Sequence, residues 1–173
     1  MGKKIAILGP ECTGKTTLAA QLAQHFHGRW IPEYARGYVA QLNRKYDYAD
    51  VEHIALVQMK QIQEADGLAP FVFFDTELII TRIWFEVVFG HEPQWLDEAI
   101  RSNPFDLYLL TDTSIPWEPD PVRENGGAMR EILFKKYEYQ LQKYRFPYHI
   151  VTGLHQQRLL NAIQFVNQYF SLP

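Results

Sequence analysis

The chain has 173 residues, of which 47% are hydrophobic and 21% charged, as is typical of one globular domain. This composition excludes a disordered tail, a coiled coil and a collagen-like repeat. Seventeen basic and twenty acidic side chains leave a net charge of -3, so bulk charge does not favour binding to nucleic acid or to an anionic membrane. A single cysteine excludes an internal disulfide and a multi-thiolate zinc site, which is typical of a reducing compartment.

The N-terminal segment does not have the pattern of a targeting sequence. Only four apolar residues, Ile5–Leu8, follow the two lysines near the start. A signal peptide needs an apolar stretch of about 7–15 residues and a membrane-spanning helix about 20. We therefore expect a cytoplasmic protein, with no membrane partner, that forms one domain over residues 1–173.

Apolar patterning predicts alternating strands and helices from the start of the chain. Ile5–Leu8 is a continuous apolar run that stops at a glycine, which is typical of a strand buried on both faces. From Thr16 onward, apolar residues at i, i+4 and i+8 predict a helix with one buried face. A weaker strand is predicted over 29–32, and a helix over 51–62 with Asp50 as its N-cap.

The second half of the chain alternates in the same way. Phe71–Phe74 is the clearest predicted strand, because four consecutive apolar residues run into an aspartate. Two further strands are predicted over 107–110 and 149–151. Helices are predicted over 78–89, 93–101, 132–144 and 159–170. Strands separated by helical patterns predict an α/β fold with a mainly parallel five-stranded sheet and helices on both faces.

Residues 112–127, called the lid segment below, interrupt this alternation. The segment holds three of the ten prolines, a glycine pair and no apolar periodicity. A patternless stretch of this length is usually a functional lid or a disordered loop. We favour a lid because Trp117 and Arg123 lie inside it. Arginines at its end, Arg123 and Arg130, can close over nucleotide phosphates, and solvated surface charge is the alternative interpretation.

The most specific motif is Gly9–Thr16, which fits the phosphate-loop (P-loop) pattern G-x-x-x-x-G-K-[ST]. It follows a predicted strand and opens a predicted helix, so its backbone N–H groups would surround a phosphate at the helix N-terminus. Lys15 would contact the β- and γ-phosphates of ATP, and the Thr16 hydroxyl would ligate Mg²⁺. The residues expected to bind ATP are Gly9, Glu11, Cys12, Thr13, Gly14, Lys15, Thr16 and Thr17.

A P-loop alone does not specify the reaction. Asp75 ends a predicted strand, where P-loop folds keep a carboxylate near the magnesium ion; a turn-forming aspartate is the alternative, and Glu77 is a weaker candidate. Asp75 is followed by Thr76, so the Asp-Glu pair that ends this strand in ATP-driven motors is absent here, and no base-reading motif of GTPases follows a late strand. These absences favour a small-molecule kinase, with a nucleotide-binding switch or weak ATPase as the alternative.

Glu33 and Arg36 follow the second predicted strand, where small kinases bind the phosphate acceptor. A carboxylate there can accept the proton of a hydroxyl, and an arginine can stabilise the charge of the transferring phosphate. A surface Glu–Arg pair is the alternative. Aromatic side chains can stack on a planar or cationic ring, although most aromatics in a chain with 14% of them belong to the core. The aromatic candidates are Tyr34, Tyr38, Trp84 and Trp117.

Taken in order, the P-loop, Glu33–Arg36, Phe74–Thr76 and Pro116–Arg123 resemble the ribosylnicotinamide kinase domain of the bacterial NadR-type regulators of NAD metabolism. The resemblance covers roughly residues 4–166 and is most specific in the Glu-Tyr-x-Arg and Trp-x-x-Asp-x-x-Arg elements. It implies phosphorylation of nicotinamide riboside on its 5′-hydroxyl, with ATP and Mg²⁺ as cofactors. It does not carry over the regulators' DNA binding or adenylyl transfer. Another nucleoside or sugar-like acceptor is the alternative within the same class. The residues expected to act in catalysis are Lys15, Glu33, Asp75 and Arg123.

Overall fold

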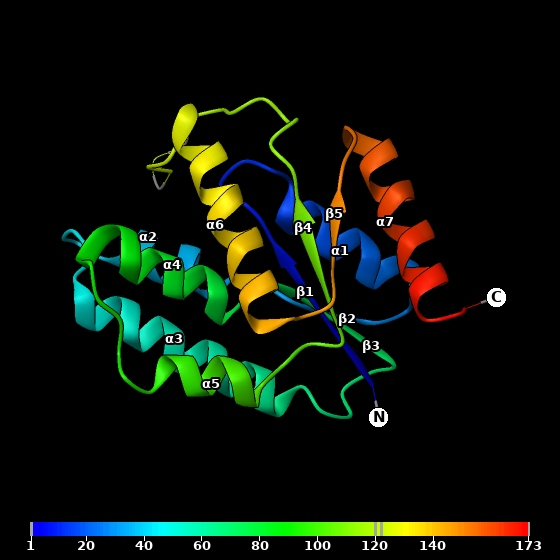
Figure 1. Ribbon diagram of the computed structural model, residues 1–173, viewed down its shortest axis with the longest axis horizontal. Helices are drawn as coiled ribbons and strands as arrows, with labels where there is room; N and C mark the ends of the chain where they lie inside the picture. Colours follow the sequence, from blue (N-terminus) through cyan, green and yellow to red (C-terminus); the bar gives the residue numbers. More distant parts are fainter. Residues whose placement is uncertain (1, 120, 122, 173) are drawn as a thin grey trace.

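The computed structural model describes residues 2–119, 121 and 123–172, and within them the chain forms a five-stranded sheet (Figure 1). The strands are β1 (Lys3–Leu8), β2 (Arg29–Ile31), β3 (Phe71–Asp75), β4 (Leu107–Thr111) and β5 (Tyr148–Val151). Their order across the sheet is β2-β3-β1-β4-β5, and every neighbouring pair is parallel. The predicted α/β architecture with a parallel five-stranded sheet is confirmed.

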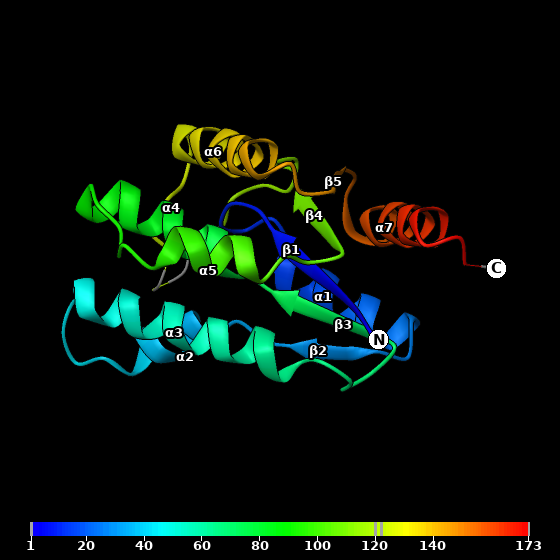
Figure 2. The ribbon, with the colours of Figure 1, turned by 60° about the horizontal axis from the view of Figure 1, so that its bottom comes forward.

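Helices cover both faces of this sheet. They are α1 (Lys15–His25), α2 (Tyr34–Gln41), α3 (Tyr48–Glu64), α4 (Leu78–Phe89), α5 (Leu96–Ser102), α6 (Ala128–Tyr144) and α7 (His155–Tyr169). One face packs against α1 and α7, and the other against α3, α4, α5 and α6 (Figures 1 and 2). Successive residues of β1 alternate between the two cores: Ile5 and Ile7 join one, and Ala6 and Leu8 the other. All four are fully buried, as the continuous apolar run predicted.

The start of α3 differs from the prediction. Asp47 is the N-cap, and its side chain accepts a hydrogen bond from the Asp50 N–H at 3.1 Å, while the Asp50 side chain accepts from the Asp47 N–H at 2.8 Å. Asp50 is therefore the third helical residue of a capping box, and the prediction that it is the N-cap was wrong. The helix begins at Tyr48 because the reciprocal pair satisfies two N–H groups at its first turn.

The sequence pattern also missed α2 and the first turns of α6 and α7. Only Ala35 is buried in α2, so the helix carries no apolar period. Helices α6 and α7 each begin four residues before the predicted start. The first turn of α7 (residues 155–158) is entirely polar, and that of α6 ends in Arg130 and Glu131. Helix α5 begins at Leu96, three residues later than predicted.

The parallel sheet determines where functional side chains gather. All strands point the same way, so the segments that follow them lie along one edge of the sheet. The P-loop follows β1, Glu33 follows β2, Asp75 ends β3 and the lid segment follows β4. The described part of the chain contains no helix that is both long and apolar enough to span a membrane.

Candidate active site

A cavity of about 620 Å³ lies at the carboxyl edge of the sheet. Small-molecule sites usually measure about 300–1,000 Å³, so the cavity is large enough for a nucleotide and a small acceptor. One end is formed by the P-loop and the first turn of α1. The other end is formed by parts of α2, α4 and α6 together with residues 121 and 123–125 of the lid segment.

The P-loop has the backbone geometry of an anion site. Gly9 has a φ of 148°, and a Cβ there would lie 2.1 Å from the Thr111 hydroxyl oxygen, so only glycine fits. Gly14 is the N-cap of α1 and supplies no side-chain acceptor. The first N–H groups of α1 are therefore left for a ligand at the end of the cavity, where the helix dipole favours negative charge. All eight residues expected to bind ATP line the cavity.

Three side chains with predicted phosphate or metal roles lie together at this end. Lys15 Nζ donates to the Pro10 carbonyl at 2.8 Å, so the ammonium group folds back over the loop. The Thr16 hydroxyl donates to Asp75 Oδ2 at 2.5 Å. Asp75 is 2% exposed, and its Oδ1 is buried with no hydrogen-bond partner among the described residues. Burial raises the pKa of Asp75, although the Thr16 hydrogen bond and the Lys15 charge oppose this shift.

Glu33 also lines the cavity. Burial raises its pKa above the ordinary value, while the positive charge of Lys15 acts in the opposite direction. The charges of Asp75 and Arg36 also act on Glu33, so these groups share one electrostatic environment. The structure thus brings the two predicted catalytic carboxylates to one site with Lys15.

The described residues of the lid segment are docked on the P-loop. The Glu11 carboxylate accepts hydrogen bonds from the N–H groups of Asn125 at 2.9 Å and Glu124 at 3.3 Å. Arg123 lines the cavity, and its guanidinium donates to the Glu118 carbonyl at 2.7 Å within the segment itself. Asp120 of the Trp-x-x-Asp-x-x-Arg element lies outside the described residues.

Three of the four aromatic candidates are not part of the cavity wall formed by the described residues. Tyr34 and Tyr38 pack against His53, with ring centroids 5.9 and 5.0 Å away. Trp117 lies over Gly126, where a Cβ would come within 3.0 Å of its ring. This arrangement gives the three rings packing roles, whereas the fourth candidate, Trp84, lines the cavity.

Two aromatic residues of the cavity, Tyr46 and Tyr137, were not predicted from the sequence. Tyr46 and Trp84 meet edge to face with centroids 4.8 Å apart, and the Tyr46 hydroxyl donates to Glu124 at 2.7 Å. Burial, together with this hydrogen bond, raises the pKa of Tyr46 to about 12. Tyr137 of α6 is 5% exposed and also lines the cavity. The apolar wall also includes Ala35, Val39, Ala40, Ile80, Ile83, Val87, Val88, Pro121 and Leu133.

The family described as AAA domain matches residues 4–158. The chain belongs to this family. Among curated proteins, it is 28% identical over 174 residues to "Trifunctional NAD biosynthesis/regulator protein NadR" of Salmonella typhimurium, covering 96% of this chain and 42% of that protein. It is 33% identical over 138 residues to the protein of the same name from Escherichia coli, covering 77% of this chain and 34% of that protein. The chain therefore spans less than half the length of these relatives, and the predicted resemblance to NadR is confirmed.

Solved structures show the same fold. A NadR protein in complex with NR, nicotinamide riboside, superposes with a TM-score of 0.79 at 20% identity, covering 99% of this chain and 52% of that one. A NadR protein in complex with NAD and AMP-PNP gives 0.77 at 22% identity, covering 97% and 49%. A deoxyadenosine kinase from M. mycoides gives 0.66 at 19% identity, covering 97% and 99%.

Proposed function

We propose that the chain is a kinase that transfers the γ-phosphate of ATP to the 5′-hydroxyl of nicotinamide riboside, giving nicotinamide mononucleotide. The observation that carries this proposal is a single cavity in which a P-loop, the half-buried carboxylate of Glu33 and an aromatic wall meet. The proposal is also supported by the curated relatives named NadR and by the NadR structure that holds NR.

At the donor end, the N–H groups of residues 13–16 would hold the phosphates of ATP. Lys15 would turn from the Pro10 carbonyl to the β- and γ-phosphates. The hydroxyl of Thr16 and the free Oδ1 of Asp75 fit the hydroxyl-plus-carboxylate pair that holds Mg²⁺ in P-loop enzymes. When bound, the ion would neutralise charge on the phosphates. The described residues contain no cluster of three metal-ligating side chains, so phosphate oxygens and water would complete its coordination.

At the acceptor end, Glu33 would orient the attacking hydroxyl and accept its proton. Its raised pKa makes Glu33 a stronger base than an exposed glutamate. The transition state of phosphoryl transfer is loose, so the rate depends more on how the hydroxyl is positioned than on the strength of the base. Arg123 lines the cavity and would stabilise charge on the transferring phosphate. The nicotinamide ring is planar and cationic, which suits the aromatic surface of Trp84 and Tyr46.

Mass spectrometry of products formed from ATP and Mg²⁺ with a mixed panel of nucleosides tests the proposal. We expect nicotinamide riboside to gain one phosphoryl group and the Lys15→Ala variant to give almost none of this product. The structural likeness to a deoxyadenosine kinase favours deoxynucleosides as the second acceptor class, so they belong in the panel. Consumption of ATP without any phosphorylated nucleoside would contradict the kinase assignment and favour a switch or weak ATPase.

A further inference from the structure

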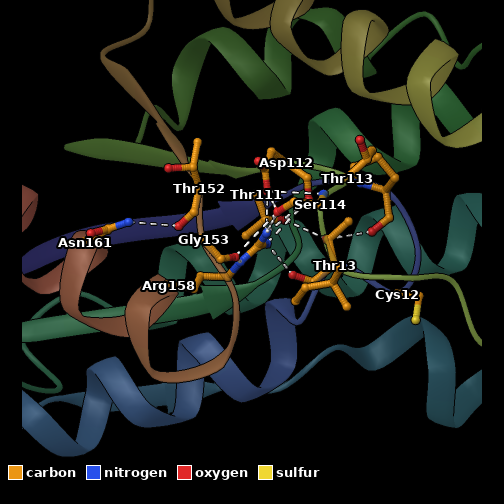
Figure 3. Close-up of polar contacts among 12 residues, drawn as sticks. Cys12, Thr13, Thr111, Asp112, Thr113, Ser114, Thr152, Gly153, Arg158 and Asn161 are labelled. Carbon is orange, nitrogen blue, oxygen red and sulfur yellow. Dashed lines mark hydrogen bonds and ion pairs between the residues drawn. The ribbon is translucent and has the colours of Figure 1, made fainter.

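A buried arginine outside the cavity is bonded to the back of the P-loop. Arg158 lies in the first turn of α7 and is 3% exposed (Figure 3). Its Nη1 donates to the Thr13 carbonyl at 2.7 Å, and its Nε donates to the Gly153 carbonyl at 2.8 Å. Its Nη2 forms an ion pair with Asp112 and donates to the Ser114 hydroxyl at 2.9 Å. One guanidinium thus joins the P-loop, the β5–α7 turn and the start of the lid segment.

The hydrogen bond from Arg158 to the Thr13 carbonyl also fixes the direction of the next N–H group, that of Gly14. A trans peptide is planar, so its C=O and the following N–H point in opposite directions. Holding the Thr13 carbonyl toward Arg158 therefore turns the Gly14 N–H away from Arg158, and Gly14 lines the cavity where a phosphate would bind. The preceding peptide is held in the same way, because Arg130 donates to the Cys12 carbonyl at 3.2 Å and to the Ile115 carbonyl at 2.7 Å.

The side chain of Thr13 adds a second restraint. Thr13 is fully buried, and its hydroxyl lies 2.6 Å from the Thr111 hydroxyl, which donates to the Leu8 carbonyl at 3.0 Å. The loop is therefore held to β4 by hydroxyl groups and to α7 by the guanidinium (Figure 3). A buried ion pair by itself contributes little net stability, so the pair with Asp112 does not explain a charged side chain here. A planar group with five N–H donors does explain it, because several acceptors on different segments must be held at once.

We propose that Arg158 is a positioning residue for nucleotide binding: it holds the Thr13 carbonyl so that the Gly14 N–H is directed at the phosphates before ATP arrives. This inference rests on the proposed function for the identity of the nucleotide. Preorganised donors need no rearrangement when the ligand binds, so the benefit falls on nucleotide affinity and not on acceptor affinity. Because Asp112 and Ser114 contact the same guanidinium as Thr13, Arg158 also holds the start of the lid segment to the P-loop.

The Arg158→Lys variant tests this inference because it keeps the charge and loses the planar fork. Titration calorimetry should show AMP-PNP binding with Mg²⁺ weakened by about 10- to 100-fold, the range of one charge-assisted hydrogen bond. Binding of nicotinamide riboside should be unchanged. In NMR spectra of the labelled protein, the shift that ADP causes in the Gly14 amide resonance should be reduced. The matched control is Arg101→Lys, which changes an exposed arginine paired with Asp97 on α5 and should alter neither affinity.

Two outcomes would overturn the inference. One is an AMP-PNP affinity equal to that of the parent chain. The other is a parallel loss of nucleotide binding, nicotinamide riboside binding and thermal stability, which would indicate a structural role only. If Arg158→Lys does not fold, Asp112→Asn takes its place and should weaken AMP-PNP binding by a smaller factor; unchanged affinity would again overturn the inference. These binding measurements need no turnover, so a parent chain that binds AMP-PNP but phosphorylates no acceptor would contradict the proposed function alone.

Discussion

Exchange of Glu33 for glutamine tests whether Glu33 acts on the acceptor hydroxyl while Asp75 binds the metal, as proposed above. The change keeps the size of the side chain but removes its charge and its capacity to take a proton. Glu33 lines the cavity and shares an electrostatic environment with Lys15 and Asp75. In the proposed mechanism, Glu33 acts on the acceptor and Asp75 serves the metal. General bases and positioning groups contribute about 10²–10⁴-fold, so Glu33→Gln should raise the barrier by about 3–5 kcal/mol.

The pH dependence adds a second readout. Burial raises the pKa of Glu33 from an ordinary value of 4.5, and the group must be ionised to act as a base. Phosphoryl transfer should therefore be lost as the pH falls through this raised pKa. In Glu33→Gln the remaining slow transfer should lack that acidic limb, because no titrating base is left.

The comparison with Asp75→Asn makes the assignment refutable. Titration calorimetry with an ATP analogue, alongside product assays at several Mg²⁺ concentrations, separates the two variants. Glu33→Gln should keep nucleotide binding and background ATP hydrolysis, whereas Asp75→Asn should weaken Mg²⁺-dependent ATP binding with any acceptor. Loss of nucleotide binding in Glu33→Gln, with only acceptor transfer affected in Asp75→Asn, would mean that the two roles are reversed.

Three further outcomes are expected. Lys15→Ala should lower turnover by about 100-fold or more in product assays without unfolding the chain, and near-normal turnover would contradict its phosphate role. Arg123→Ala should lower kcat more than it weakens ADP binding, and hydrogen exchange over 113–127 should slow when an ATP analogue and acceptor are added; unchanged exchange would argue against a lid. Glu77 caps α4 from a buried position where burial raises its pKa to about 8. Because the folded chain holds this proton more tightly, thermal melts should show stability falling as the pH rises from 5 to 8, and a Glu77→Gln variant with the same slope would exclude Glu77 as the cause.

The donor half of the site could be predicted from the sequence because it is local. The P-loop is one uninterrupted segment between a buried strand and a helix, and strand order in a parallel sheet brings Asp75 beside it. The wrong N-cap prediction for α3 has a physical reason. Asp50 and Asp47 are both good capping residues, and apolar spacing alone does not distinguish the N-cap from the third residue of a capping box.

The acceptor half could not be predicted in the same way. Tyr46 and Tyr137 lie far apart in the chain, and each has the sequence setting of an ordinary core aromatic, whereas Trp84 was the one aromatic candidate that lines the cavity. Conversely, Tyr34 and Tyr38 sit next to Glu33 in the sequence, but the α2 helix turns them toward His53. Closeness to Glu33 in the sequence did not predict which side chains line the cavity, because α2 has no apolar periodicity from which its buried face could be assigned.

The P-loop end of the cavity and the α4 part of its wall are constrained by the fold to different degrees. The donor half depends on backbone groups, and a change in its geometry would disturb β1, β4 and α7 together. On α4, by contrast, Ile83, Val87 and Val88 all line the cavity, but Ile83 is 1% exposed and also belongs to the core, whereas Val87 and Val88 are 39% and 41% exposed. Exposed positions can be exchanged at a cost within about 0.5 kcal/mol of stability, so the part of the wall formed by Val87 and Val88 can change shape without weakening the sheet or the P-loop. For the proposed kinase, acceptor preference can therefore change at Val87 and Val88 at little cost in stability, whereas Ile83, Leu133 and Tyr137 are fixed by their part in the core.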